Sequence, residues 1–351
     1  MSNNKDGKLD HRQLKEQFIT KLGYCRKEVL QGPAIGVDVA IIQIDDSTGL
    51  VVASDPLSII PTLPMEISAW LSVHLMANDI ATSGFLPSFG QFVLNLPTSL
   101  SAEQAADYWN YVHVYCKEIG IHITGGHTAF DSFTQSTLAG GGTLFSIAPL
   151  DGIKTSAMAQ IDDDLIMTKT AAFSSSAILA LSFPHYIKKE LGEEVLQKAK
   201  ENFFRTSIIP EVKLLRQHKN LFQEINAMHD VTEKGIIGAS YEFAQASQTS
   251  IKLFRENILV DEEPKQVCQL FSIDPEISVA AGSLLIACRP TATSKIIELL
   301  QTNHIAAAHI GKFQKEEASS PLRNASGENI LYPTEDPYWS AYFNAFKNGL
   351  S

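Results

Sequence analysis

The chain has 351 residues, more than one hydrophobic core usually serves, so two domains are expected. Apolar residues make up 44% and charged residues 19%, a balance typical of an ordinary globular protein. The formal net charge is −11, with acids spread along the chain, and this disfavours nucleic-acid binding because that function needs a basic face.

The cysteines and the hydropathy pattern indicate in which cellular compartment the protein resides. Four cysteines lie far apart with no CxxC pair, so they favour neither a zinc site nor a disulfide framework and fit a reducing compartment. No apolar run follows the basic N-terminal residues, which argues against a signal peptide. No apolar stretch reaches the roughly 18 residues of a membrane span. We therefore expect a cytoplasmic protein that neither spans nor joins a membrane.

The first half of the chain alternates between strand-like and helix-like patterns. Apolar spacing predicts helices over 13–29, 67–83 and 102–120, and strands over 37–44, 49–54, 89–96, 121–124 and 137–146. Ser101 is the expected cap of the third helix, and Gly125-Gly126 is expected to end the strand before His127. Acids or glycines stand at the strand ends, a pattern typical of an α/β domain whose site lies at its loops.

The central stretch is Met76 to Pro87, where Asn78 and Asp79 lie side by side among small apolar residues of the second helix. An acid on a core helix must be paired, hydrogen-bonded or holding a cation, because burying a lone charge costs several kcal/mol. Taken alone, Asp79 fits better as an acid on a solvated face or as a cap of a neighbouring segment.

The second half repeats the alternation. The pattern predicts an acidic turn within 160–169 that leads into a strand ending at Lys169, and further strands over 251–253, 283–288 and 305–311. It predicts helices over 171–181, 261–270 and 291–303, two helices within 190–219, and a C-terminal aromatic cluster of Tyr338, Trp339, Tyr342 and Phe343. Lys169 ends the first of these strands beside a helix start, where a phosphate is favourable, although such a lysine is more often a surface residue.

The stretch after Met228 holds another acid at a helix start. Asp230 and Glu233 have the spacing of a capping box, so an ordinary capped helix is one interpretation. Gly235 and Gly238 in the first turns are unusual, since each costs about 1 kcal/mol relative to Ala. They predict tight packing against a ligand or a partner helix.

Four segments thus share one design, with an acid beside a strand end or helix end: Asp38, Asp55, Asp79 and Asp230. Asp38 and Asp55 taken singly are consistent with turn formers. Converging carboxylates would repel unless divalent cations lay between them, and Mg²⁺ is usually held by one or two carboxylates plus substrate phosphates. The chain has no GxxxxGK[ST] and no GxGxxG after its first strand, so neither a Walker loop nor a dinucleotide fold is indicated.

Seven short motifs occur along the chain in a fixed order. Each motif alone is weak evidence for a protein family, but their number and order together are specific. They are Gly-Pro-Ala-Ile-Gly-Val-Asp38, Ser-Asp55-Pro, Asn78-Asp79-Ile-Ala-Thr-Ser-Gly-Phe-Leu-Pro, Gly-Gly-His127-Thr, Met-Thr-Lys169, Met-His-Asp230-Val-Thr-Glu233 and Ala-Gly-Ser-Leu-Leu-Ile. Over about 14–311 the chain resembles the aminoimidazole ribonucleotide synthase (PurM-like) superfamily, within it the AIR-synthase-related proteins similar to HypE.

The resemblance implies a two-domain α/β (α+β) fold divided as 1–152 and 153–351, with the N-terminal domains pairing in a homodimer to form a β-barrel interface. It implies ATP and Mg²⁺ as cofactors, and phosphorylation or dehydration of a small amide or carbonyl substrate. A maturation partner protein is also implied for HypE-like members.

The resemblance also assigns roles to residues. The implied metal ligands are Asp38, Asp55, Asp79 and Asp230. The implied catalytic residues are Asp79, Asp230 and His127, and the implied nucleotide-binding residues are Asn78, Gly125, Gly126, Lys169, Thr232 and Glu233.

Several positions depart from the family's pattern. The chain ends at Ser351 without the terminal cysteine of hydrogenase-type members, and Gly32–Gly36 lacks the cysteine of selenium-transfer members. Ala172-Phe173-Ser174-Ser175-Ser176 stands where relatives read Gly-x-Glu-Gly-Thr, and Lys234 stands where relatives have glycine. Two further hypotheses therefore stay open: a catalytically reduced nucleotide-binding scaffold, and a small-molecule kinase of the thiamine-monophosphate-kinase type.

Overall fold

The computed structural model describes residues 8–132, 134, 138–315 and 320–351, and the chain forms two compact units. The N-terminal unit comprises 27–32 and 38–153. The C-terminal unit comprises 33–37, 154–351 and the first 26 residues, as far as they are described. Residues 8–26 are therefore part of the C-terminal unit although they precede the N-terminal unit in the sequence.

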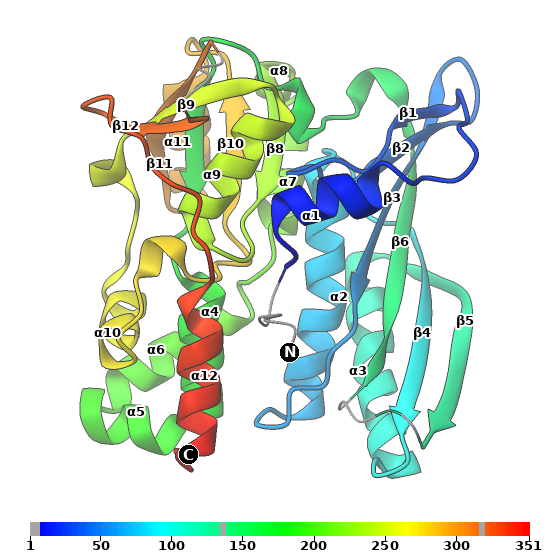
Figure 1. Ribbon diagram of the computed structural model, residues 1–351, viewed down its shortest axis with the longest axis vertical. Helices are drawn as coiled ribbons and strands as arrows, with labels where there is room; N and C mark the ends of the chain where they lie inside the picture. Colours follow the sequence, from blue (N-terminus) through cyan, green and yellow to red (C-terminus); the bar gives the residue numbers. More distant parts are fainter. Residues whose placement is uncertain (1–7, 133, 135–137, 316–319) are drawn as a thin grey trace. The chain divides into compact units, whose positions relative to one another are not determined.

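The N-terminal unit is one six-stranded sheet covered on one face by two helices (Figure 1). Its elements are β1 Val29–Gln31, β2 Ala40–Gln43, β3 Thr48–Pro56, α2 Met65–Thr82, β4 Phe89–Pro97, α3 Ala102–Ile119, β5 His122–Asp131 and β6 Ala139–Pro149. The strand order is β1-β2-β3-β6-β4-β5, and only the β4–β5 pair is parallel.

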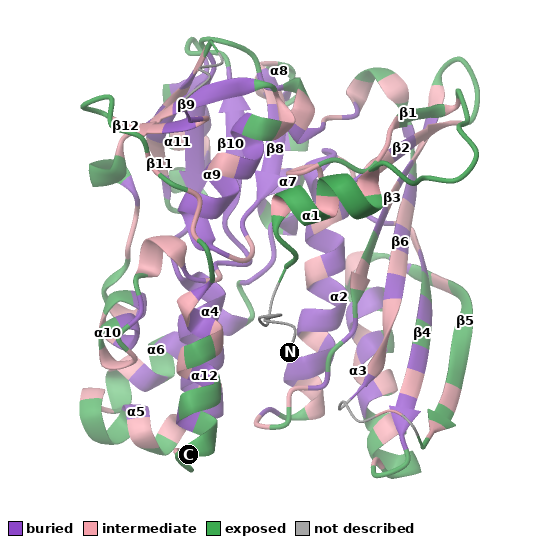
Figure 2. Cartoon of the chain, in the orientation of Figure 1, coloured by how far each residue is buried: buried purple, intermediate pink, exposed green. Residues whose placement is uncertain are grey.

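The helices of this unit form where the sequence predicts them. α2 is largely buried (Figure 2), because apolar and small residues occupy nearly all of its faces. α3 begins at a capping box in which Ser101 and Gln104 satisfy each other's backbone N–H groups, and it ends at Gly120 in the left-handed conformation.

The C-terminal unit holds a second six-stranded sheet in the order β12-β9-β11-β7-β10-β8, of which only β12–β9 is parallel. Its strands are β7 Asp164–Thr168, β8 Ile225–Asp230, β9 Thr249–Leu253, β10 Leu284–Cys288, β11 Ala307–Lys315 and β12 Leu322–Asn324. Its helices are α1 His11–Leu14, α4 Phe173–Ser182, α5 Pro184–Leu191, α6 Glu193–Phe203, α7 Ile209–Gln217, α8 Lys219–Gln223, α9 Gly235–Ala246, α10 Glu262–Leu270, α11 Thr293–Thr302 and α12 Pro337–Lys347. β7 and β10 are buried along their whole length, which matches their continuous apolar sequences.

The predicted aromatic cluster belongs to α12 and packs on this unit. Tyr338 and Tyr342 are buried, and the Tyr342 ring lies 5.6 Å from that of Phe183. No helix in the described ranges combines the length and the apolar character that crossing a membrane requires.

Two predicted elements are wrong. The helix predicted over 13–29 is replaced by α1, which ends at Leu14, and a π-helical segment over Lys15–Ile19, and β1 begins at Val29. The apolar side chains of that segment are largely exposed, Phe18 by 54% and Leu22 by 57%. A longer helix would therefore bury almost no additional apolar surface.

The strand predicted to stop at Gly125-Gly126 instead continues to Asp131, because β4 offers a pairing partner throughout. A Cβ on Gly126 would clash with the Phe92 carbonyl, so this glycine permits close strand pairing. For the strand predicted over 137–146, Thr137 lies outside the described residues, and β6 begins at Ala139.

Candidate functional site

Two predicted carboxylates are associated with one face of the N-terminal sheet. Asp55 is paired directly with Gly142 of β6, and directly paired residues point to the same face. A Cβ on Gly142 would lie 2.5 Å from the Met76 sulfur, so this is the face that α2 covers. Asp79 follows Met76 by nearly one helical turn and therefore shares its side of α2.

The other residues predicted for the site in this unit lie in or near β2, α2 and β5. Asp38 lies two residues before β2, and Asn78 is buried in α2. Gly125, Gly126 and His127 lie within β5, where His127 pairs with Val93 of β4. Carboxylate and amide oxygens are the donors that Mg²⁺ prefers, so the donor set of the N-terminal unit fits that ion. The convergence of its carboxylates with Asp230 stays a prediction.

Asp230 is the last residue of β8, and the loop after it leads into α9. The predicted capping box is wrong. The residue preceding α9 is Lys234, in a left-handed conformation with φ of 65°, and no side chain caps the helix. The Lys234 backbone N–H donates instead to Asp336 Oδ2 at 2.6 Å. Asp336 also caps α12 by accepting from Tyr338 N at 2.9 Å, so one carboxylate fixes two helix starts.

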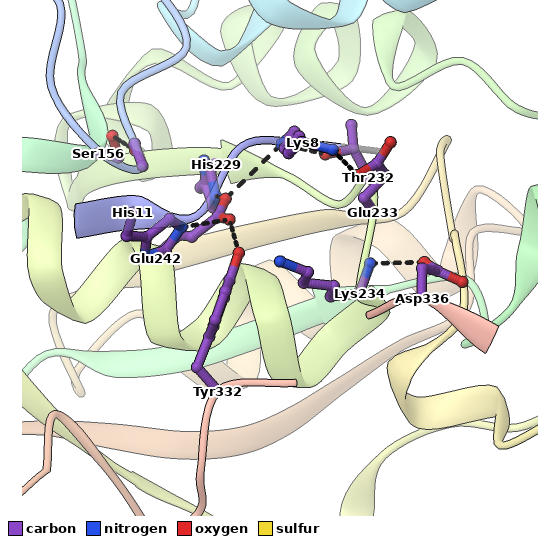
Figure 3. A network of polar contacts seen from close by, with 11 residues as sticks. Lys8, His11, Ser156, His229, Thr232, Glu233, Lys234, Glu242, Tyr332 and Asp336 are labelled. Carbon is purple, nitrogen blue, oxygen red and sulfur yellow. Dashed lines mark hydrogen bonds and ion pairs between the residues drawn. The ribbon is translucent and has the colours of Figure 1, made fainter. Parts of the chain in front are cut away.

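The loop between Asp230 and α9 is held by the start of the chain. The Lys8 backbone N–H donates to Glu233 Oε2 at 2.9 Å, and its ammonium donates to Thr232 Oγ1 at 3.1 Å. Figure 3 shows these contacts together with the neighbouring Glu242 cluster. Thr232 and Glu233, predicted to bind nucleotide, therefore contact the N-terminal segment in this structure.

Glu242 of α9 is the centre of a polar cluster (Figure 3). Its Oε1 accepts from Tyr332 Oη at 2.6 Å and lies 3.4 Å from His11 Nε2. Its Oε2 lies 3.8 Å from His229 Nε2 and 3.9 Å from Lys8 Nζ. Burial raises the pKa of this carboxyl, but Lys8, His11 and His229 outweigh it and hold the pKa well below its usual range.

Lys169 is buried, and its ammonium group is bound by protein groups. Its ammonium donates to the carbonyls of Ser207 and Gly282, each at 2.7 Å, and lies 2.6 Å from Glu211 Oε1. Burial lowers the pKa of Lys169, and Glu211 opposes the shift. An ammonium has three donors, so binding a phosphate as predicted would require Lys169 to give up one of these partners.

The start of α4, next to Lys169, is also engaged. The Ser175 N–H donates to the Val279 carbonyl at 3.1 Å, and Ser174 Oγ accepts from Ala281 N at 2.9 Å. Ser176 Oγ donates to the Ala172 carbonyl at 2.7 Å. Ser174 and Ser175 thus bind the start of α4 to the segment before β10, whereas Ser176 bonds within the start of the helix itself.

Sequence reasoning missed Lys8, His11, Glu242, Tyr332 and Asp336. Glu242 carried a usable signal, because it lies in an apolar helix between Tyr241 and Phe243. The others sit in polar segments where nothing distinguishes them from solvated residues.

The sequence matches two parts of one protein family. Residues 36–146 match "AIR synthase related protein, N-terminal domain" and residues 160–322 match "AIR synthase related protein, C-terminal domain". A selenide, water dikinase of Methanococcus maripaludis is 26% identical over 304 residues, covering 83% of this chain and 88% of that protein.

Two solved structures share the fold. A ThiL structure described as complexed with AMPPCP and TMP aligns with a TM-score of 0.67 at 17% identity, covering 87% of this chain and 92% of that one. The structure of a HypE–HypF complex aligns with a TM-score of 0.66 at 18% identity, covering 84% and 93%. The two matched domains, in this order and over most of the chain, show that the protein belongs to the AIR synthase related family, within the PurM-like superfamily.

Proposed function

We propose that this chain is a magnesium-dependent enzyme that uses ATP to phosphorylate or dehydrate a small amide or carbonyl substrate. The observation that carries the proposal is the location of Asp55 and Asp79 on the α2-covered side of the N-terminal sheet. A relative named as a dikinase and a fold neighbour described with AMPPCP support the choice of ATP.

In this proposal Asp38, Asp55 and Asp79 hold Mg²⁺ in the N-terminal unit, and Asp230 is a further ligand by resemblance. Bound magnesium would neutralise charge on the triphosphate. Asn78 and His127, with the Gly125-Gly126 backbone, are proposed to orient the nucleotide. Thr232, Glu233 and Lys169 are proposed to do so in the C-terminal unit, once their present partners are exchanged.

The test is nucleotide turnover by the Asp79→Asn variant, assayed as ADP release with selenide, thiamine monophosphate and small carboxamides as acceptors. Losing a carboxylate that holds the metal should reduce turnover about 100-fold or more. Asp107→Asn changes an exposed acid on α3 of the same unit and should leave turnover unchanged. A folded Asp79→Asn protein with full turnover would refute the proposal.

A second candidate is a nucleotide-binding scaffold without catalysis. Its support is that the start of α4 and Lys169 already have protein partners, as described above. This candidate predicts ATP binding with no turnover of any acceptor, so turnover with even one acceptor rejects it. A maturation partner protein, as in the HypE–HypF complex, would fit this candidate.

We also propose a homodimer formed through the N-terminal units. β5 is the edge strand of its sheet and is exposed or half-exposed along its whole length (Figure 2). Such an edge offers unpaired backbone groups to a second copy. Light scattering should give a mass of about twice 38.5 kDa, and a mass of one chain would reject the dimer.

A further inference from the structure

A cleft of about 1040 Å³ lies within the C-terminal unit, between the N-terminal segment and the α9 region. We name it the N-terminal cleft. Its charged lining comprises the cations Lys8, Arg12, Lys15 and Lys234 and the acids Asp10 and Glu16. The volume is that of a small-molecule site.

The charge of this cleft opposes that of the chain. Four cations line it against two carboxylates, although the whole protein carries −11. Asp10 is already engaged, because its carboxylate accepts from the N–H groups of Arg12 and Gln13 at the start of α1. Lys8 is engaged as well, by Thr232 and Glu242, so the excess of cations rests on Arg12, Lys15 and Lys234. A concave surface with an excess of one sign concentrates ligands of the opposite sign.

Lys234 is held in the cleft at a conformational cost. Its φ of 65° belongs to the left-handed region, which is unfavourable for any residue with a Cβ. Gly238, one turn on, makes room for it, since a Cβ there would lie 2.5 Å from the Lys234 Cβ. A glycine at position 234 would adopt this conformation without strain. The backbone therefore gives no reason for a lysine here, and we look for its role in the side chain.

The Lys234 ammonium lies 4.2 Å from the centre of the Tyr332 ring (Figure 3). The same ring lies 4.3 Å from His11 and 5.0 Å from Tyr241, so three rings form an aromatic wall beside the cations. Tyr332 Oη is committed to Glu242, which fixes this wall.

We propose that the N-terminal cleft binds the phosphate group of a small phosphorylated molecule, with Lys234 as its main cationic ligand. A dianion matches several lysines and an arginine better than a single-charge group does. The assignment of that molecule as the acceptor substrate rests on the proposed function. The binding itself needs neither ATP nor magnesium.

The experiment is calorimetric titration of inorganic pyrophosphate into the full chain in the presence of EDTA. The wild-type protein should show saturable binding that weakens with added salt. Lys234→Gly should weaken it about tenfold or more, because a charge-assisted contact is lost, while its Tm should not fall. Lys213→Ala, an exposed lysine on α7, is the matched control and should bind as the wild type does.

Absence of saturable binding in EDTA, or equal affinity of the Lys234→Gly and wild-type proteins, would overturn the proposal. Lys15→Ala removes an exposed cation of the cleft and should also weaken binding, which keeps the test decisive if Lys234→Gly does not fold. Asp79→Asn should bind pyrophosphate normally while losing turnover, so this site and the proposed nucleotide site can fail separately.

Discussion

Two buried acids of the C-terminal unit differ in how their surroundings shift their pKa. Glu242 and Asp336 are both nearly inaccessible to solvent, yet their surroundings act in opposite directions. Cations and imidazoles around Glu242 favour its ionised form. Asp336 accepts hydrogen bonds from the backbone N–H groups of Lys234 and Tyr338, and burial raises its pKa to about 6 despite them.

Asp336 should therefore impose a pH dependence on stability. Its folded pKa of about 6 exceeds the ordinary value of 3.8, so the folded state binds more protons between these values. The free energy of unfolding should fall as pH rises from about 4 to 6, by up to about 3 kcal/mol from this group. Asp336→Asn should flatten that slope in urea titrations relative to the wild type. Parallel slopes for the two proteins would contradict this assignment.

At the scale of elements, α9 shows how much a local pattern can predict. Gly235 and Gly238 indicated close packing, and the structure identifies both neighbours. A Cβ on Gly235 would lie 2.6 Å from the Glu276 carbonyl oxygen, and one on Gly238 would meet Lys234. The Asp230–Glu233 spacing indicated a cap that does not form, because Asp336, more than a hundred residues away, supplies the contact at this helix start.

The N-terminal segment, residues 8–19, is attached to α9 through contacts of Lys8 and His11 with Glu242. Glu242→Gln removes the charge that attracts Lys8 and His11, so this segment should detach more readily. We expect trypsin to cleave faster at the exposed Arg12 and Lys15 in this variant. Glu201→Gln changes an exposed acid on α6 and should be cleaved as the wild type is. Equal cleavage of all three proteins would show that Glu242 does not hold the segment.

For the whole molecule, the sequence was most informative where packing is periodic. α2, α3, β7 and β10 lie close to their predicted ranges because their apolar spacing reflects burial directly. The attachment of the chain's start to the C-terminal unit was not predictable, since it depends on polar contacts such as Lys8 to Glu233, 225 residues apart. No local pattern encodes such a pairing.

The same limit applies to the candidate site. Motif order identified the family, and the pairing of Asp55 with Gly142 shows which face of the sheet Asp55 lies on, while its role as a metal ligand stays a prediction. Motif spacing could not show that Lys169 is engaged by Glu211 and two carbonyls, because these partners come from segments far along the chain. Family membership thus transfers a fold, while the state of each side chain must be read from its own contacts.

The carboxylates of the N-terminal unit are proposed to bind ATP through magnesium. The most direct measurement is calorimetric titration of ATP into the wild-type and Asp79→Asn proteins, first with magnesium and then with EDTA. We predict about one nucleotide per chain with magnesium, no binding in EDTA, and binding weakened about tenfold or more by Asp79→Asn. ATP binding that is unchanged by EDTA and by the substitution, or no ATP binding under either condition, would contradict a magnesium-dependent site at these carboxylates.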